Sequence, residues 1–254
     1  MKKHLILNLM LVVALMLSFQ NEAFPQRKKD KVQPPEMITT NLDGAGLEIT
    51  LEATPGKSHN HPMMAVWVED SGGKYIQTLY VNESVAKGYF NYADKSEGKW
   101  KPGELVRPAS LPVWAHKRGV KSDAGHYMPT QSNPIPDAYT SATPEAGFVL
   151  QSKTDKSVAG KFKVLFEINQ SWDWNEYWTN SKFPDDDEYK TSAQPSVVYA
   201  VDIDPEKLQE SYELKPVGHG HHSGKDGNIN PDLSTITTAL QIVEIITVKV
   251  SRKK

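Results

Sequence analysis

Residues 133–147, NPIPDAYTSATPEAG, place two carboxylates and several hydroxyls among small residues and prolines. The stretch has no helical or strand period, so we expect a loop that proline keeps extended and accessible. It fits the pattern D-x-x-[S/T]-[G/S]-A-T through Asp137, Thr140, Ser141, Ala142 and Thr143. An accessible Thr143 hydroxyl beside small residues suits esterification in the cleft of another enzyme. The alternative is a plain surface turn, which Ser, Thr, Asp and Pro also favour.

A second loop, VGHGHHSGKDGNINPDLS at 217–234, is rich in histidine. Neutral imidazoles at this spacing can bind zinc, copper or nickel. The candidate ligands are His219, His221 and His222, joined by His59 and His61 of SHNHP. Histidines that merely hydrogen-bond within a loop are the alternative to a metal site.

The same loop alternates oxygen-bearing side chains in a way that resembles half of a calcium loop. The members are Asp226, Asn228, Asn230 and Asp232. Pro231 stands where such loops need glycine, and Thr237 replaces the bidentate glutamate. The calcium pattern is therefore incomplete.

Two further segments carry aromatic and basic side chains. SWDWNEYW at 171–178 contains Trp172 and Trp174, which can stack on a flat ring or a sugar or can fill core. LPVWAHKRG at 111–119 contains Trp114, His116, Lys117 and Arg118, and its cations suit a phosphate. A solvated basic turn is the alternative for this second segment.

The elements that must position these residues are predicted to be strands. GKFKVLFEIN alternates, with Phe162, Val164, Phe166 and Ile168 on one face, and similar runs recur from Gly46 onward. MMAVWVED and KYIQTLYV are joined by DSGGK, which predicts a β-hairpin. We therefore expect an all-β fold, an antiparallel immunoglobulin-like β-sandwich with long decorated loops. The segment 82–145 is predicted to be a long irregular insert, which is usually functional or mobile.

The amino-acid composition excludes several classes of function. The 254 residues suffice for one sizeable domain, and 29 basic against 31 acidic residues leave no basic footprint for nucleic acid. The chain has no cysteine, which excludes disulfides, thiolate iron–sulfur clusters and C-x-x-C-H haem attachment. Neither a P-loop, nor G-x-G-x-x-G, nor G-x-S-x-G is present.

The N-terminus predicts export. MKKH followed by the apolar run LILNLMLVVALMLSF is typical of a secretory signal peptide, here residues 1–23. Residues 24–40, rich in Lys, Pro and Gln, are predicted to be a linker, and 41–254 a single β-sandwich domain. We expect a periplasmic or secreted protein of a Gram-negative cell envelope.

With these residues in view, the pattern at 137–143 is similar to the acceptor motif for covalent flavin attachment in exported bacterial flavoproteins, with Ser141 where glycine is common. The resemblance implies that a periplasmic FMN transferase esterifies the FMN phosphate onto Thr143. Candidate contacts to the flavin are then Trp114, His116, Lys117, Arg118, Trp172 and Trp174.

From about residue 46 to 250 the chain also resembles domain-of-unknown-function family 2271, a group of predicted periplasmic bacterial proteins. The resemblance rests on AVWVEDSGGKYIQTLYV, WAHKRG, PDAYTSATPEAG, KFKVLFEIN, PSVVYA and GHGHHSGKDGNINPDLSTITTALQIVEIITV. It implies an exported β-rich domain linked to extracytoplasmic flavin electron transfer, with membrane PepSY-type reductases as partners. It assigns no catalytic residue and no oligomeric state.

Two hypotheses follow. The first is a redox carrier with covalent FMN, rather than an enzyme with its own substrate. The second is a non-catalytic binding module of the cell envelope that holds a metal ion or a glycan through its His- and Trp-rich loops.

Overall fold

The computed structural model of the chain describes residues 34–94 and 96–252. The predicted signal peptide and residues 24–33 of the predicted linker lie outside the described residues. Glu36–Thr39, also assigned to the linker, instead form strand β1, so the domain begins before the predicted boundary at 41. No helix among the described residues is both long and apolar enough to cross a membrane.

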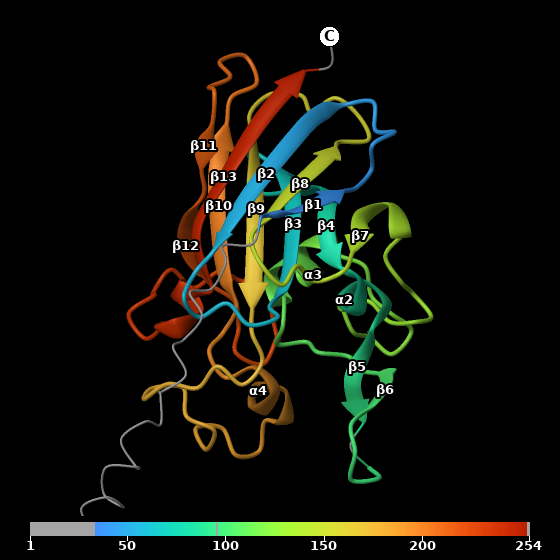
Figure 1. The fold of residues 1–254 in the computed structure, drawn as a ribbon, viewed down its shortest axis with the longest axis vertical. Helices are drawn as coiled ribbons and strands as arrows, with labels where there is room; N and C mark the ends of the chain where they lie inside the picture. The colour runs from blue at the N-terminus through green and yellow to red at the C-terminus, as the bar shows by residue number, and fades with distance from the viewer. Residues whose placement is uncertain (1–33, 95, 253–254) are drawn as a thin grey trace, which may run out of the picture. The chain divides into compact units, whose positions relative to one another are not determined.

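Two sheets pack face to face, which confirms the prediction of an all-β sandwich (Figure 1). The five-stranded sheet has the order β1, β8 (Phe148–Lys153), β2 (Leu47–Pro55), β13 (Val243–Arg252) and β11 (Tyr212–Glu213). The six-stranded sheet has the order β12 (Lys215–His219), β10 (Val197–Ile203), β9 (Phe162–Asn169), β3 (Met63–Asp70), β4 (Tyr75–Asn82) and β7 (Thr140–Ser141). All pairings are antiparallel except β1–β8 and β4–β7.

The main core lies between the two sheets. Phe162, Val164, Phe166 and Ile168 are fully buried on one face of β9, as the alternation predicts. Across the core, β13 contributes Ile246, Val248 and Val250. Each such side chain stabilises the fold by roughly 1.5–3 kcal/mol relative to an exposed one.

The six-stranded sheet is covered on its outer face as well. A second apolar cluster joins Ala65 and Trp67 of β3 to Leu111, Val113 and Trp114. The covering layer is the segment 83–141, which carries α2 (Glu83–Lys87), β5 (Tyr89–Asp94), β6 (Lys101–Glu104), α3 (Pro112–Arg118) and the 3-10 turn η1 (Asp137–Tyr139). The predicted irregular insert is therefore a third layer of the domain, and β5 with β6 forms a hairpin that projects from it (Figure 1).

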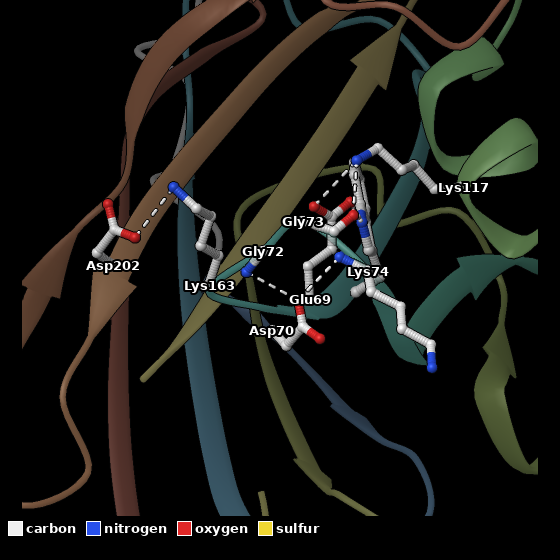
Figure 2. Close-up of polar contacts among 9 residues, drawn as sticks. Glu69, Asp70, Gly72, Gly73, Lys74, Lys117, Lys163 and Asp202 are labelled. Carbon is white, nitrogen blue, oxygen red and sulfur yellow. Dashed lines mark hydrogen bonds and ion pairs between the residues drawn. The ribbon is translucent and has the colours of Figure 1, made fainter. Parts of the chain in front are cut away.

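The β3–β4 hairpin forms as DSGGK predicts. The Asp70 carboxylate accepts the backbone N–H groups of Gly72 and Lys74, both at 2.9 Å, and Gly73 takes φ +79° (Figure 2). Figure 2 also shows Lys117 of α3 reaching Glu69 and the Gly73 carbonyl, at 3.3 and 2.9 Å. This contact fixes the outer layer against the turn of the hairpin.

The remaining described elements are short: α4 (Asp187–Ser192) and η2 (Thr238–Gln241) lie in the connections before β10 and before β13. They pack at the end of the sandwich where β9 finishes and β10 begins. The same end carries the end of β4, because Val81 pairs with Ala65 and Met63 pairs with Asn169.

Candidate functional site

The acceptor-like segment lies along the β4 edge of the six-stranded sheet. Thr140 and Ser141 form β7, which pairs in parallel with Val81 and Asn82. The preceding Asp137 begins a single 3-10 turn, and its side chain is 84% exposed. Ala142 is also exposed, so the segment presents both ends of its motif to solvent.

Thr143 is half-buried, and a buried asparagine orients its hydroxyl. Asn82 Nδ2 donates to Thr143 Oγ1 at 2.9 Å, while Asn82 Oδ1 accepts the backbone N–H of Met64. The Thr143 hydroxyl is thus held as an acceptor, and no other hydrogen bond to this oxygen is formed within the described residues. Its proton remains available to a base from outside.

A second buried residue braces the same turn. The Tyr80 hydroxyl donates to the carbonyl of Ala142 at 3.1 Å and accepts from Asn82 Nδ2 at 3.2 Å. Burial raises the pKa of Tyr80 far above its ordinary value, so the phenol stays protonated and remains a donor. The Thr143 hydroxyl and the carbonyl that precedes it are therefore both held in place from inside the sheet.

The other polar members of the motif have local partners. Thr140 Oγ1 donates to the carbonyl of Asp137 at 3.3 Å. Lys87 Nζ lies 3.6 Å from Asp137 Oδ1 and also pairs with Glu83. Thr140 is thus a turn-forming hydroxyl, whereas Asp137 is an exposed anion beside a cation.

Two pockets flank the segment, and Ile135 with Pro136 lines both. The first has a volume of about 550 Å³ and is bounded by Lys87, Tyr89 and Asp137. The second, of about 240 Å³, lies between the start of β4, Arg118 and Tyr139. A group tethered at this segment therefore has hollows on the adjoining surface in which to rest.

The basic segment 111–119 is predominantly structural. Trp114 is fully buried, and its Nε1 donates to Thr78 Oγ1 at 2.9 Å, so it offers no face to a ligand, contrary to expectation. Lys117 is committed to Glu69, and His116 packs against Tyr127 with ring centroids 4.1 Å apart. Arg118 is the member of this segment that lines a pocket.

The aromatic loop divides into a buried part and an exposed part. Trp174 packs half-buried against the core, at 5.8 Å between its ring centroid and that of Tyr189. Trp172 is 56% exposed, adopts φ +59°, and lies 6.2 Å from the ring of Trp100. Of the two predicted stacking residues, Trp172 alone presents a broad free surface.

The histidines do not assemble into a metal site. His222 stacks on Phe183 at 4.2 Å and on His221 at 4.3 Å, and burial followed by the His221 charge lowers the pKa of His222 to about 4. His219 is buried, His61 is exposed, and His59 lies between the carbonyls of Ile242 and Pro144. Among residues 34–94 and 96–252, no group of three or more His, Cys, Asp or Glu side chains is arranged to hold a metal ion.

The calcium-like residues serve the backbone of their own loop. Asp226, Asn230 and Asp232 each accept the N–H group two residues later, at 2.9, 3.1 and 2.9 Å. Asn228 is exposed and donates its backbone N–H to Asp226. The alternation reflects successive turns of this kind rather than a converging set of ligands.

The histidine loop and the aromatic loop lie at the same end of the six-stranded sheet as Thr143. The register pairs His219 with Val197, Val197 with Ile168, and Ser141 with Asn82. The loops and Thr143 therefore share one end, but β12 and β7 form opposite edges of that sheet. The histidine loop is thus a separate feature from the Thr143 surface.

Glu167 was not among the predicted site residues. It sits on the face of β9 that the alternation assigned to solvent, yet it is fully buried beneath α3. Its carboxylate accepts from Ser196 Oγ at 2.6 Å and from the backbone N–H groups of Val113 and Trp114 at 3.2 and 2.7 Å. Burial raises the pKa of Glu167 to about 7, against the effect of these hydrogen bonds. The near-continuous apolar run of β3 was the available signal that this face is covered.

No protein-family model, no curated protein and no solved structure matches this chain.

Proposed function

We propose that the protein is an exported electron carrier of the cell envelope that holds FMN through a phosphoester on Thr143. The observation that carries the proposal is the placement of this hydroxyl. It lies at an accessible sheet edge, oriented by Asn82, within a segment that matches the flavin-acceptor pattern. A resemblance to domain-of-unknown-function family 2271 agrees with this role.

The residues around Thr143 fit a covalently attached FMN. Thr143 offers a surface hydroxyl, small Ala142 leaves room for a foreign cleft, and the exposed Asp137 is a charge that a transferase can read. Pockets beside the segment offer the flavin a place to rest. FMN when bound supplies the capacity to accept and release electrons, and the chain has no cysteine that could supply it through a thiol–disulfide couple.

The donor of the FMN group in the attachment step is flavin adenine dinucleotide. Thr143 Oγ1 forms the new bond to the FMN phosphorus, the pyrophosphate bond of the donor breaks, and the adenylate leaves with the electron pair. A base of the transferase removes the threonine proton. The partners implied are a periplasmic FMN transferase and, for electrons, a membrane PepSY-type reductase.

The test is intact-mass spectrometry of the full chain after coexpression with an exported FMN transferase. The expected product carries FMN minus one water, and Thr143→Ala abolishes the adduct. Loss of the Asn82 hydrogen bond costs about 1 kcal/mol, so Thr143→Ala remains folded. Thr140→Ala and Asp137→Ala are expected to reduce labelling without abolishing it.

Thr130→Ala is the matched control, since Thr130 is another half-buried loop threonine. A wild-type chain that stays unlabelled while a known acceptor is labelled refutes the proposal. Equal labelling of wild type and Thr143→Ala refutes the site.

A glycan-binding module is the second candidate, favoured by one observation. Trp172 and Trp100 form an exposed aromatic pair, and the backbone strain at Trp172 is the kind that clusters at binding sites. Saturable binding of envelope glycans that Trp172→Ala removes, in a chain without any flavin adduct, would favour this candidate.

A further inference from the structure

The smaller pocket beside the acceptor segment contains an unusual cation. Arg118 is half-buried and stacks on the buried indole of Trp114, with the guanidinium carbon 5.0 Å from the ring centroid. Within residues 34–94 and 96–252, no carboxylate lies in ion-pair distance of Arg118 and it donates no hydrogen bond to a side chain or carbonyl. Burial lowers the pKa of this guanidinium, and the neighbouring Tyr75 hydroxyl opposes that effect.

The scaffold around Arg118 is rigid. Trp114 Nε1 donates to Thr78 Oγ1, which in turn bonds the Tyr75 hydroxyl at 2.8 Å. Tyr139 and Asp155 also line the pocket, and the Tyr139 hydroxyl donates to Asp155 at 3.0 Å. A half-buried cation without an ion-pair partner, held on such a frame, is a site prepared for an electron-rich group.

The shape of the pocket narrows the choice of that group. Its apolar and aromatic lining comes from Tyr75, Ile76, Ile135, Pro136 and Tyr139, and its polar lining comes from Gln77, Thr78, Asp155 and Arg118. Its volume of about 240 Å³ is below the roughly 300–1,000 Å³ typical of sites for whole ligands. A flat ring system with one electron-rich edge matches this arrangement better than a free phosphate, which needs no apolar walls.

The pocket is within reach of Thr143. Tyr139, on its wall, precedes Thr143 by four residues, and an extended chain of that length spans about 13 Å. The phosphate and ribityl chain that join a threonine oxygen to a flavin ring comprise eight single bonds, which extend to about 10 Å. The ring itself makes up the remaining distance.

We infer that this pocket seats the isoalloxazine ring of the flavin carried by Thr143, with Arg118 against the ring edge that becomes negative on reduction. The inference rests on the proposed function. In that position Arg118 favours the reduced ring, in which two electrons from a reductase and one proton from water have been added, and therefore raises its potential. The cation that lines the larger pocket, Lys87, is already paired with Glu83 and Asp137 and so cannot favour a reduced ring in the same way.

The experiment uses the full chain, coexpressed with the transferase and first verified by mass to carry FMN. Flavin fluorescence and the midpoint potential are then compared in wild type, Arg118→Gln, Arg118→Lys and Val120→Trp. Val120 is exposed at the pocket, so its replacement by tryptophan fills the pocket with little cost to the fold. Circular dichroism confirms the fold of each variant.

We expect the wild-type fluorescence to be quenched by the neighbouring tyrosines and to recover on denaturation. Arg118→Gln should shift the equilibrium against the reduced ring roughly tenfold, which is about 30 mV for a two-electron couple. Arg118→Lys should restore most of that shift, and Val120→Trp should abolish the quenching.

Lys87→Gln is the control for the larger pocket. Loaded Arg118→Gln and Val120→Trp proteins with wild-type fluorescence and potential overturn the inference while the proposed function stands. A shift in Lys87→Gln alone also overturns it, by placing the ring in the larger pocket. A wild-type chain without FMN overturns the proposed function, and the inference with it.

Discussion

Replacing Glu167 with glutamine is expected to change how the stability of the protein depends on pH. The carboxyl is fully buried between β9, α3 and Ser196, and its folded-state pKa is about 7 against an ordinary value of 4.5. Between these values the folded state holds a proton that the unfolded state has released. The free energy of unfolding of the wild type therefore falls as pH rises from 4.5 to 7.

The magnitude follows from the size of that window. Each pH unit between the two pKa values changes the free energy of unfolding by about 1.4 kcal/mol, so the whole contribution is about 3 kcal/mol. Glu167→Gln lacks the titration, although its amide replaces at least one accepting oxygen with a donor that faces the N–H groups of α3. The substitution therefore destabilises the variant by an amount that does not change with pH. The contribution of Glu167 to the stability of the wild type does change with pH.

The assay is urea unfolding followed by tryptophan fluorescence, at half-unit steps from pH 4.5 to 7.5. Between pH 4.5 and 7 the free energy of unfolding of the wild type should fall by about 3 kcal/mol relative to that of Glu167→Gln. Above pH 7 the difference between the two proteins should stay constant. Glu52→Gln, at an exposed position of β2, is the control and should show no such trend. If the difference in free energy of unfolding between wild type and variant does not change from pH 4.5 to 7, this prediction is refuted.

Two further predictions concern stability. Lys117→Met removes the cation beside the Glu69 carboxylate, which is 3% exposed and keeps the Trp67 indole as a hydrogen-bond donor. The free energy of unfolding in urea at pH 7 should fall by about 2 kcal/mol. An unchanged unfolding midpoint would contradict this prediction. Trp172→Asn should raise the free energy of unfolding by about 1 kcal/mol, because asparagine tolerates φ +59° better than an exposed indole does. A lower melting temperature for Trp172→Asn would instead show that the contact with Trp100 outweighs the strain.

Patterns local in the sequence predicted local structure correctly. The alternation in β9 placed Phe162 and Phe166 in the core, and DSGGK formed the hairpin between β3 and β4. In both cases the information lies within a few neighbouring residues, since side-chain alternation and turn chemistry do not depend on distant partners.

Features that depend on distant segments were missed. Nothing near Glu36 indicates that β1 pairs with β8 more than a hundred residues later, and a two-residue strand such as β7 has no period to detect. The basic neighbours of Trp114 favour a ligand contact, but the layer packed on the outer face of the sheet buries this side chain. Burial is decided by what covers a face, and that is a property of the whole chain.

The candidate site was predicted in part. The segment 137–143 lies at an accessible edge, as its prolines and small residues favoured, but Asn82 and Tyr80, which hold it, belong to a strand with an ordinary apolar pattern. The histidines were grouped by spacing alone, yet spacing in a loop does not fix where imidazoles point. The structure directs His219 and His222 against aromatic rings.

The brevity of β7 determines how easily the segment 137–143 can separate from its sheet. β7 is held to its sheet by two paired residues, whereas the next strand, β8, is paired along its length on both sides. Between them, Pro144 and Gly147 are buried, so the chain is clamped where it crosses from one sheet to the other. Because the cost of local opening follows the number of contacts broken, lifting 137–143 costs a small fraction of global unfolding. The segment can thus open as a flap hinged at Pro144 while the two sheets stay packed.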